Sequence, residues 1–354
     1  MLEVVLPEKS YEIIIQRNAL DQVADWLSGL WQEKKIAIIS DENVFPLYGQ
    51  KIQQQLADRY EVVNYVIPAG EESKSLSMAA KLYDFLATEQ LTRSDGIIAL
   101  GGGVVGDLAG FVASTYMRGI SFVQIPTSLL AQVDSSIGGK TAVNAPNAKN
   151  MIGTFAQPDG VLIDPETLMT LPVKRIQEGI AEIIKCGAIK DESLWRELAR
   201  FIDVADLVAH SELVIEKALR VKKEVVEEDQ FDQGSRLFLN FGHTIGHAIE
   251  QTAGYGQISH GEAVAIGMVQ ISRNAEKRKE TPEGTTQQLI KMIQKYQLPI
   301  SYEPWDEQAL FQAITHDKKA RGKQLKIILL EKIGQAKIQS IPIEAIKNYL
   351  EEGE

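Results

Sequence analysis

Cysteine is almost absent from the sequence. Cys186 is the only one among 354 residues, so the chain cannot form an internal disulfide. A secretory leader is missing as well, because the opening residues MLEVVLPEKSYEIII lack a basic region followed by an apolar stretch and a cleavage site. No apolar run approaches the roughly 18 residues that a membrane-spanning helix needs. These absences predict a cytoplasmic protein with no membrane partner.

An excess of basic residues is also absent. The 37 lysines and arginines are outnumbered by 48 aspartates and glutamates, which gives a formal net charge of -11 and disfavours binding to nucleic acid. Basic residues nevertheless gather around the motifs described below: Lys140, Lys149, Lys185, Lys222 and Arg236. We therefore expect no nucleic-acid partner and a pocket that binds an anionic small molecule.

The hydrophobic pattern predicts two domains that meet near residue 170. A chain of this length exceeds the usual size of a single core. In the first part, short apolar runs predict strands over residues 35–39, 61–67, 96–100 and 121–125, and helical spacing predicts helices over 44–58, 75–90 and 103–114. We expect an α/β, Rossmann-like domain with a mostly parallel sheet over residues 1–170.

The second part of the chain has few strand signals. Helical patterns cover residues 173–189, 194–201, 211–226, 237–252, 262–274 and 286–296, and a late hairpin is indicated at 325–330 and 336–341. We expect residues 171–354 to form a mainly α-helical domain that binds metal and substrate.

A glycine-rich turn joins a predicted strand to a predicted helix. Residues 101–106 read GGGVVG and satisfy the G-x-G-x-x-G pattern, in which glycines let the backbone approach a pyrophosphate. A tight turn without a ligand is the alternative. The acid expected about 20 residues later is missing, since that region reads QIPT; Asp41, Glu71 or Glu72 could replace it. The pattern indicates a variant dinucleotide site.

Three of the five histidines fall close together, at His243, His247 and His260. The first two are four apart on a predicted helix and therefore share one face, so spacing alone predicts that both bind one metal ion. The residue after His243 is threonine, where a zinc protease would have its glutamate base. The alternative is histidines bonded to core carbonyls. A carboxylate ligand could come from Glu182 or Glu262.

Glu182 and Lys185 lie three apart within an apolar predicted helix. Such a pair is often a solvated surface contact. Burial is favoured here by the apolar surroundings, Ile180 through Ala188. A buried carboxylate needs a metal or cation, and a buried lysine suits a substrate anion. We therefore expect a functional role for both.

The motifs together resemble the 3-dehydroquinate synthase family, nearly from end to end. The residues that carry the resemblance are PAGEESKS at 68–75, GGGVVGDLAG at 101–110, TYMRG at 115–119, PTSLLAQVDSSIGGK at 126–140, KNMIG at 149–153, GIAEIIK at 179–185, LNFGHTIGHAIE at 239–250 and HGE at 260–262. The resemblance implies a lyase of the shikimate pathway that turns 3-deoxy-D-arabino-heptulosonate 7-phosphate into 3-dehydroquinate and phosphate. It also implies catalytic NAD, Zn2+ (with Co2+ as an alternative) and a homodimer.

The resemblance assigns roles residue by residue. It implies that Glu182, His243 and His260 bind the metal and that His247 transfers a proton, which replaces the ligand pair chosen from spacing. It places NAD at Asp41, Asn43, Glu71, Glu72, Ser73, Lys74, Gly103, Val104, Val105, Gly106, Asp107, Thr127, Ser128, Lys140, Lys149, Thr167 and Thr170. It places the substrate at Asp134, Lys140, Asn150, Lys185, Lys222, Arg236 and Asn240.

Further positions also follow from the resemblance. Arg118 matches an arginine that is lent across a dimer interface, and one of Lys318, Lys319 and Lys323 is expected near substrate. Asp232 departs from the family, which often has glutamate there.

Other readings of the same motifs are a metal-dependent polyol or alcohol dehydrogenase, another sugar phosphate cyclase, and an NAD-responsive binding module. The cyclase alternatives act on sedoheptulose 7-phosphate or glucose 6-phosphate, which lack a carboxylate. Arg236, Asn240 and His247 together favour the dehydroquinate reaction.

Overall fold

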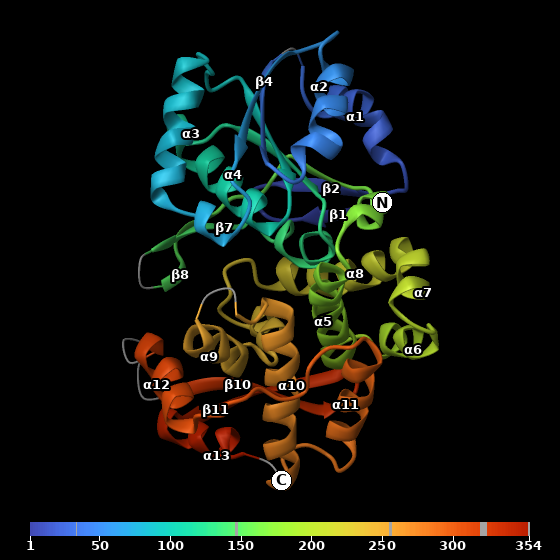
Figure 1. The fold of residues 1–354 in the computed structure, drawn as a ribbon, viewed down its shortest axis with the longest axis vertical. Helices are drawn as coiled ribbons and strands as arrows, with labels where there is room; N and C mark the ends of the chain where they lie inside the picture. Colours follow the sequence, from blue (N-terminus) through green and yellow to red (C-terminus); the bar gives the residue numbers. More distant parts are fainter. Residues whose placement is uncertain (33, 146–147, 255–256, 319–323, 353–354) are drawn as a thin grey trace. The chain divides into compact units, whose positions relative to one another are not determined.

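The computed structural model describes residues 1–354 except 33, 146–147, 255–256, 319–323 and 353–354. The chain forms two compact units, Met1–Leu171 and Pro172–Glu354, which Figure 1 shows in a colour gradient along the sequence. The domain boundary predicted from the sequence lies after residue 170. Within the described residues, no helix combines the length and the apolar character needed to cross a membrane.

The amino-terminal unit is built on a seven-stranded sheet in the order β1-β2-β9-β6-β5-β3-β4. Its strands are β1 (Leu2–Val5), β2 (Ser10–Ile15), β3 (Lys35–Asp41), β4 (Glu61–Ile67), β5 (Gly96–Gly101), β6 (Ser121–Pro126) and β9 (Gly160–Ile163). All neighbours are parallel except β1 and β2. The predicted mostly parallel sheet is therefore confirmed.

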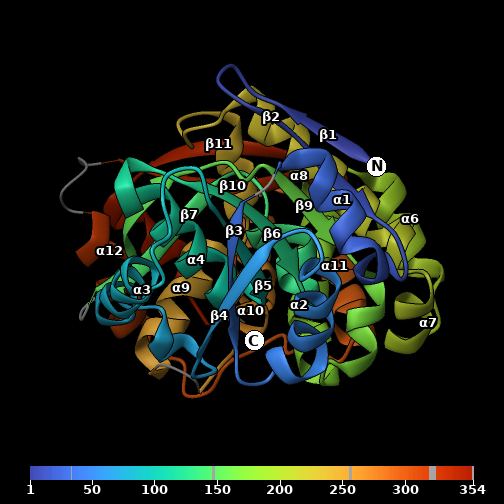
Figure 2. The ribbon, with the colours of Figure 1, turned by 90° about the horizontal axis from the view of Figure 1, so that it is seen from above.

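Helices cover both faces of this sheet because its strands are apolar on both sides. Along β3, Ile36 and Ile38 pack with α1 and α2 residues, whereas Ala37 and Ile39 pack with α3 and α4 residues, as the two-residue repeat of a strand requires. Figure 2 shows α1 and α2 on one side of the strands and α3 and α4 on the other. The helices are α1 (Val23–Leu30), α2 (Gln50–Leu56), α3 (Leu76–Thr88) and α4 (Gly103–Thr115).

A short antiparallel hairpin, β7 (Lys140–Ala145) and β8 (Ala148–Phe155), packs against α4. The hydrophobic pattern does not predict this hairpin, and it does not predict β1, β2 and β9. A Cβ atom on Gly110 of α4 would lie 2.5 Å from Cγ2 of Thr141, so glycine lets the hairpin approach the helix closely.

The carboxy-terminal unit is mainly helical, as predicted. Its helices are α5 (Val173–Ile189), α6 (Glu192–Arg200), α7 (Val204–Ala209), α8 (Ser211–Glu228), α9 (His243–Ala253), α10 (His260–Lys277), α11 (Thr285–Lys295), α12 (Glu307–Lys318) and α13 (Lys347–Leu350). The predicted late hairpin is present as β10 (Gln324–Lys332) and β11 (Gln335–Pro342). Helix α10 lies at the centre of the unit and contacts α5, α9 and α11.

The predicted helix over residues 237–252 is wrong in one respect. The segment forms a 3₁₀ helix over Ser235–Asn240 and then, after a break, α9. Gly242 causes the break, with a φ of 78° in the left-handed region. A Cβ atom there would also lie 2.7 Å from the carbonyl oxygen of Val264 in α10. His243 consequently becomes the first residue of α9.

Candidate functional site

The three clustered histidines converge in the carboxy-terminal unit. His243 and His247 lie one turn apart on α9, and His260 begins α10. One ring nitrogen of each lies within 4.8 Å of the others. The ring centroids are 5.2 Å apart for His243 and His260, and 5.3 Å apart for His243 and His247. His260 thus joins His243 and His247 from a different helix, which the spacing of residues along one helix cannot predict.

Glycines allow these helices to approach at backbone distance. A Cβ atom on Gly267 of α10 would lie 2.1 Å from the carbonyl oxygen of Gly242, and one on Gly246 of α9 would lie 3.0 Å from that of Ala263. Gly261, next to His260, comes equally close to α5, since its Cβ atom would lie 2.4 Å from the carbonyl oxygen of Glu178. The close approach of α5, α9 and α10 is what brings their side chains into one cluster.

Glu182 of α5 lies against two of the imidazoles. Its Oε1 is 3.5 Å from Nε2 of His243 and 3.5 Å from Nε2 of His260, longer than a normal hydrogen bond. The residue is only 1% exposed, and Oε1 has no hydrogen-bond partner among the described residues. One carboxylate oxygen and two imidazole nitrogens form a typical donor set for Zn2+. The residues therefore fit a divalent cation.

Lys185, one turn further along α5, forms an ion pair with Oε2 of Glu182, and it is 2% exposed. Burial alone would raise the pKa of Glu182, but the charges of Lys185 and the nearby imidazoles outweigh it and hold that pKa well below its ordinary value. The alternative of a solvated surface pair is thus excluded, and Glu182 is a carboxylate anion at neutral pH.

The two imidazoles that contact Glu182 differ in their electrostatics. Burial, reinforced by the charge of Lys185, lowers the pKa of His243 to about 3. Its Nδ1 donates to the carbonyl oxygen of Phe241 at 3.1 Å, which leaves Nε2 as a lone-pair donor. Burial would also lower the pKa of His260, but contacts with Glu182 and Glu250 outweigh it and raise that pKa to about 10.

Glu262, the other carboxylate considered from the sequence, has a different role. Its Oε2 accepts the backbone N–H of Ser259 at 2.9 Å, and Ser259 Oγ accepts the backbone N–H of Glu262. This capping box begins α10. Oε1 of Glu262 also lies 3.4 Å from Nζ of Lys174. Glu262 therefore helps to hold His260 at the helix start, and Glu182 is the carboxylate that contacts the imidazoles.

Two further predicted cations are buried in elements that pack against α5. Lys222 lies on α8 and Arg236 in the 3₁₀ helix that precedes α9 and ends at Asn240. Arg236 is 2% exposed, and its Nη1 donates to the carbonyl oxygen of Gln230 at 2.7 Å. The backbone N–H of Arg236 donates to Oδ2 of Asp229 at 3.1 Å. Buried cations of this kind are suited to an anionic ligand.

In the amino-terminal unit, the glycine-rich turn lies between β5 and α4. A Cβ atom on Gly103 would lie 3.0 Å from Ser135 Oγ, and one on Gly102 would lie 3.3 Å from Ser128 Oγ. At Gly106 a Cβ atom would lie 2.6 Å from Oε1 of Gln124 in β6, so this glycine serves helix–strand packing. Val104 and Val105 continue the first turn of α4. The positive end of this helix is suited to a phosphate group.

Lys74 connects residues that the sequence analysis named separately. It is 5% exposed, and its Nζ donates to Oδ2 of Asp107 and to Oδ1 of Asn150, both at 2.5 Å. Asn144 extends the network: its Nδ2 donates to Oε1 of Glu71 at 2.7 Å, and its Oδ1 accepts the backbone N–H of Asn150. Asn144 was missed, since nothing in its sequence context distinguishes it.

Two predicted threonines, Thr167 and Thr170, are hydrogen-bonded to side chains that carry no signal in the sequence. Nε2 of the buried Gln132 donates to Oγ1 of Thr167 at 2.9 Å and also contacts the carbonyl oxygen of Pro126, which precedes Thr127. The hydroxyls of Tyr48 and Thr170 lie 2.5 Å apart. A glutamine and a tyrosine without neighbouring charges give no signal in a sequence.

The remaining predicted residues are placed as follows. Oδ1 of Asp41 accepts the backbone N–H groups of Asn43 and Val44, so it shapes the turn after β3. Glu72 and Ser73 follow β4, and Ser73 Oγ donates to the carbonyl oxygen of Pro68. The others are Arg118 (exposed, with a φ of 68°), Ser128 and Asp134 (partly buried), Lys140 (exposed, at the start of β7) and Lys149 (partly buried, in β8). Lys319 and Lys323 lie outside the described residues, as does the side chain of Lys318.

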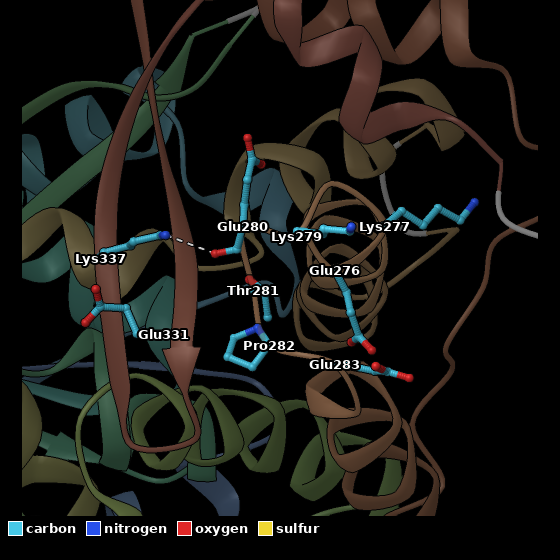
Figure 3. Close-up of a pocket in the computed structure, with 9 residues that line it drawn as sticks. All are labelled: Glu276, Lys277, Lys279, Glu280, Thr281, Pro282, Glu283, Glu331 and Lys337. Atoms are coloured by element: carbon cyan, nitrogen blue, oxygen red, sulfur yellow. Dashed lines mark hydrogen bonds between the residues drawn. The ribbon is translucent and has the colours of Figure 1, made fainter.

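A separate pocket of about 480 Å³ lies in the carboxy-terminal unit. Figure 3 shows its lining, from the end of α10 to the β10–β11 hairpin, where Nζ of Lys337 donates to the carbonyl oxygen of Glu280 at 2.9 Å. Its lining residues include none of the predicted site residues.

Known proteins resemble this chain along nearly its full length. Residues 64–178 match the family described as 3-dehydroquinate synthase N-terminal, and residues 179–320 match 3-dehydroquinate synthase C-terminal. A 3-dehydroquinate synthase of Enterococcus faecalis is 60% identical over 350 residues, which is 99% of this chain and 98% of the relative.

Solved structures of two sugar phosphate cyclases have the same fold. A 2-epi-5-epi-valiolone synthase from Streptomyces hygroscopicus with NAD+ and Zn2+ bound has a TM-score of 0.88 and 29% identity, covering 98% of this chain and 97% of that one. A 2-deoxy-scyllo-inosose synthase in complex with carbaglucose-6-phosphate, NAD+ and Co2+ has a TM-score of 0.86 and 25% identity, covering 99% and 98%.

Proposed function

The chain belongs to the 3-dehydroquinate synthase family, and from that premise we propose that it converts 3-deoxy-D-arabino-heptulosonate 7-phosphate into 3-dehydroquinate and phosphate. The structural observation that carries the proposal is the position of Glu182, whose buried Oε1 lies 3.5 Å from Nε2 of both His243 and His260. Such a donor set is suited to a divalent cation, and the reaction of this family needs one.

Glu182, His243 and His260 would hold Zn2+ or Co2+, and NAD would be held in the amino-terminal unit. When bound, the metal polarises a substrate hydroxyl, and NAD accepts a hydride there and later returns it, so the lyase reaction involves no net oxidation. The chain's own groups must then bind the anionic ends of the substrate and handle its protons.

The buried cations of the carboxy-terminal unit are suited to the two anionic groups of the substrate. Lys185, Lys222 and Arg236 are each at most 6% exposed, and Arg236 can grip a carboxylate or phosphate with two parallel hydrogen bonds. Asn240, which follows Arg236 by one turn, adds an amide that can donate to the same ligand. A phosphorylated sugar acid supplies both anions, whereas a neutral polyol supplies neither.

His247 is the member of the histidine cluster that is exposed, and Glu182 contacts the other two. We assign it proton transfer at a substrate oxygen, because histidine is the side chain that most often exchanges protons near neutral pH. His243 and His260 are not suited to this role, because an imidazole nitrogen that binds a metal cannot accept a proton.

The amino-terminal unit would bind NAD along the ends of its parallel strands. The first turn of α4, from Gly103 to Asp107, would face the pyrophosphate, and the network of Lys74 with Asp107 and Asn150 would hold another part of the cofactor. Ser128, Lys140 and Lys149 belong to the same proposed NAD set, whereas Asp134 and, again, Lys140 are proposed to contact the substrate. We further propose a cytoplasmic homodimer in which Arg118 serves the partner's site.

The test is an assay of the purified protein with Zn2+, a catalytic amount of NAD and the heptulosonate phosphate, in which released phosphate and dehydroquinate are measured together. Equal amounts of both, without lasting absorbance of NADH, are expected. Sustained NADH accumulation would instead identify a polyol or alcohol dehydrogenase. Turnover of sedoheptulose 7-phosphate or glucose 6-phosphate in place of the acid would identify another sugar phosphate cyclase.

A further inference from the structure

A second carboxylate approaches the histidine cluster from the side opposite Glu182. Glu250 lies on α9, seven residues after His243 and three after His247, so all three share one helix face. It is 7% exposed, and its Oε2 lies 3.2 Å from Nδ1 of His260. Nε2 of the same ring faces Oε1 of Glu182 at 3.5 Å. The His260 ring is thus held between two carboxylates from different helices.

This contact decides which nitrogen of His260 keeps its proton when a cation binds. A carboxylate anion can only accept a hydrogen bond, so Nδ1 must carry the proton that it donates to Glu250. With a carboxylate on each side, the ring carries a proton on both nitrogens as long as no cation is bound. A cation that binds between Nε2, Glu182 and His243 would replace the Nε2 proton, whereas the Nδ1 proton stays bonded to Glu250. The opposite tautomer would place a lone pair against the Glu250 carboxylate.

The other proposed imidazole ligand is oriented by a weaker partner. Nδ1 of His243 donates to the neutral carbonyl oxygen of Phe241, two residues earlier in the chain. His260 instead has a full negative charge behind it, which makes its Nε2 more electron-rich and fixes the plane of the ring. The two imidazoles therefore differ in what holds them, and a side-chain substitution can remove only the support of His260.

We propose that Glu250 is a positioning residue of the metal centre, which holds His260 in the tautomer and orientation that binds the cation and strengthens that bond. The inference rests on the proposed metal site formed by Glu182, His243 and His260. It adds a residue that does not itself bind the metal. Carboxylates in this position typically change metal affinity by about 10- to 100-fold.

The test compares Glu250→Gln with the control Glu276→Gln in the full-length protein. Glu276 lies on α10, the helix of His260, and its two oxygens accept the backbone N–H groups of Gly284 and Thr286, so the control also removes a hydrogen-bonded carboxylate. Zn2+ affinity is measured by competition with a chromophoric chelator, without NAD or substrate. We expect E250Q to bind Zn2+ at least tenfold more weakly than the unaltered protein, and E276Q within about twofold of it.

The visible absorption of the Co2+-loaded proteins provides a readout that a purely structural role would not move. The bands of E250Q should shift because the His260 ligand changes, and those of E276Q should not. If E250Q does not fold, Glu250→Asp takes its place in the same measurements, because its side chain is one methylene shorter and its carboxylate no longer reaches His260. A Zn2+ affinity equal to that of the unaltered protein would overturn the inference. Failure of the unaltered protein to bind Zn2+ would instead overturn the proposed metal site itself.

Discussion

The two units make their candidate sites in different ways. In Met1–Leu171 the candidate cofactor site consists mostly of turns at the ends of parallel strands, where backbone groups around Gly103 would contact the proposed ligand. In Pro172–Glu354 the candidate metal site consists of side chains on three helices, with Glu182, His243 and His260 at its centre. Glycine allows close packing in both units: it lets α4 meet a strand and the β7–β8 hairpin in the first, and lets α5, α9 and α10 meet in the second.

The two kinds of site should respond differently to substitutions. A site made of backbone groups tolerates most side-chain changes and is sensitive to added Cβ atoms or to the loss of a residue that holds its turns. A site made of side chains is lost when a single ligand is changed, even if the fold is unaffected. The following substitutions test this contrast.

The largest effect is expected for Glu182→Gln, which keeps the shape of the side chain and removes its charge. Metal catalysis supplies several kcal/mol of transition-state stabilisation, so kcat should fall about a thousandfold, equivalent to about 4 kcal/mol. Zn2+ affinity should fall with it, whereas NAD affinity should stay within about twofold. Steady-state kinetics, chelator competition and NAD titration measure the three quantities.

Glu178→Gln is the matched control, because Glu178 lies one turn earlier on α5, is also buried, and pairs with Arg175. It should keep Zn2+ affinity within about twofold. If the Glu182 variant kept full Zn2+ affinity, Glu182 would not be a metal ligand, and the contrast between a side-chain site and a backbone site would fail.

The next effect concerns stability and tests the role of glycine in the helical unit. Gly267→Ala should lower the free energy of unfolding by about 3 kcal/mol, because the new Cβ atom meets the carbonyl oxygen of Gly242, which is backbone and cannot rotate away. Gly29→Ala, in α1, is the control: no atom lies within 4 Å of its Cβ position, so it should stabilise by about 0.5 kcal/mol. Urea unfolding measures both. Equal stability of the two variants would show that α9 and α10 can separate at no cost.

These glycines also show what the sequence could and could not predict. The strands β3, β4, β5 and β6 were predictable because each is mostly apolar and is bounded by turn residues, although Asn64 interrupts β4 and Gln124 interrupts β6. The strand β9 has only four residues, and the break at Gly242 depends on the approach of α10, which no local pattern contains. Element type was therefore accessible from local sequence, whereas the ends of elements at close helix contacts were not.

The candidate metal site shows the same limit. Spacing along one helix pairs His243 with His247, because a periodicity argument sees only residues on the same element. The contact of Glu182 with His243 and His260 joins three helices, and only the family resemblance suggested that set from sequence. Glu250 had no signal of its own, since its partner His260 lies on the next helix.

A smaller effect is expected for Lys74→Met, which tests how far the cofactor site depends on side chains. The substitution leaves Asp107 and Asn150 without the ammonium that now joins them, so NAD affinity should fall about thirtyfold, or about 2 kcal/mol. Lys81→Met, at an exposed position on α3, should leave it unchanged. Calorimetric titration with NAD measures both, and chelator competition should show unaltered Zn2+ affinity. An unchanged NAD affinity in the Lys74 variant would mean that backbone groups alone hold the cofactor.

The smallest effect concerns Asp229, a carboxylate that supports backbone within the side-chain site. Its oxygens accept the backbone N–H groups of Gln233, Gly234 and Arg236. Burial would raise the pKa of Asp229, but these hydrogen bonds outweigh it and lower that pKa below its ordinary value. The stabilisation is therefore complete above the unfolded value of about 3.9 and is lost as the pH falls through the lower folded value. Asp229→Asn should lower the free energy of unfolding by about 1 kcal/mol at pH 7; the loss is small because the carboxylate is partly exposed. The difference in urea unfolding midpoint between the variant and the unaltered protein should shrink towards pH 3. A difference that stays constant from pH 7 to pH 3 would show that the charge of Asp229 does not hold the loop of Arg236.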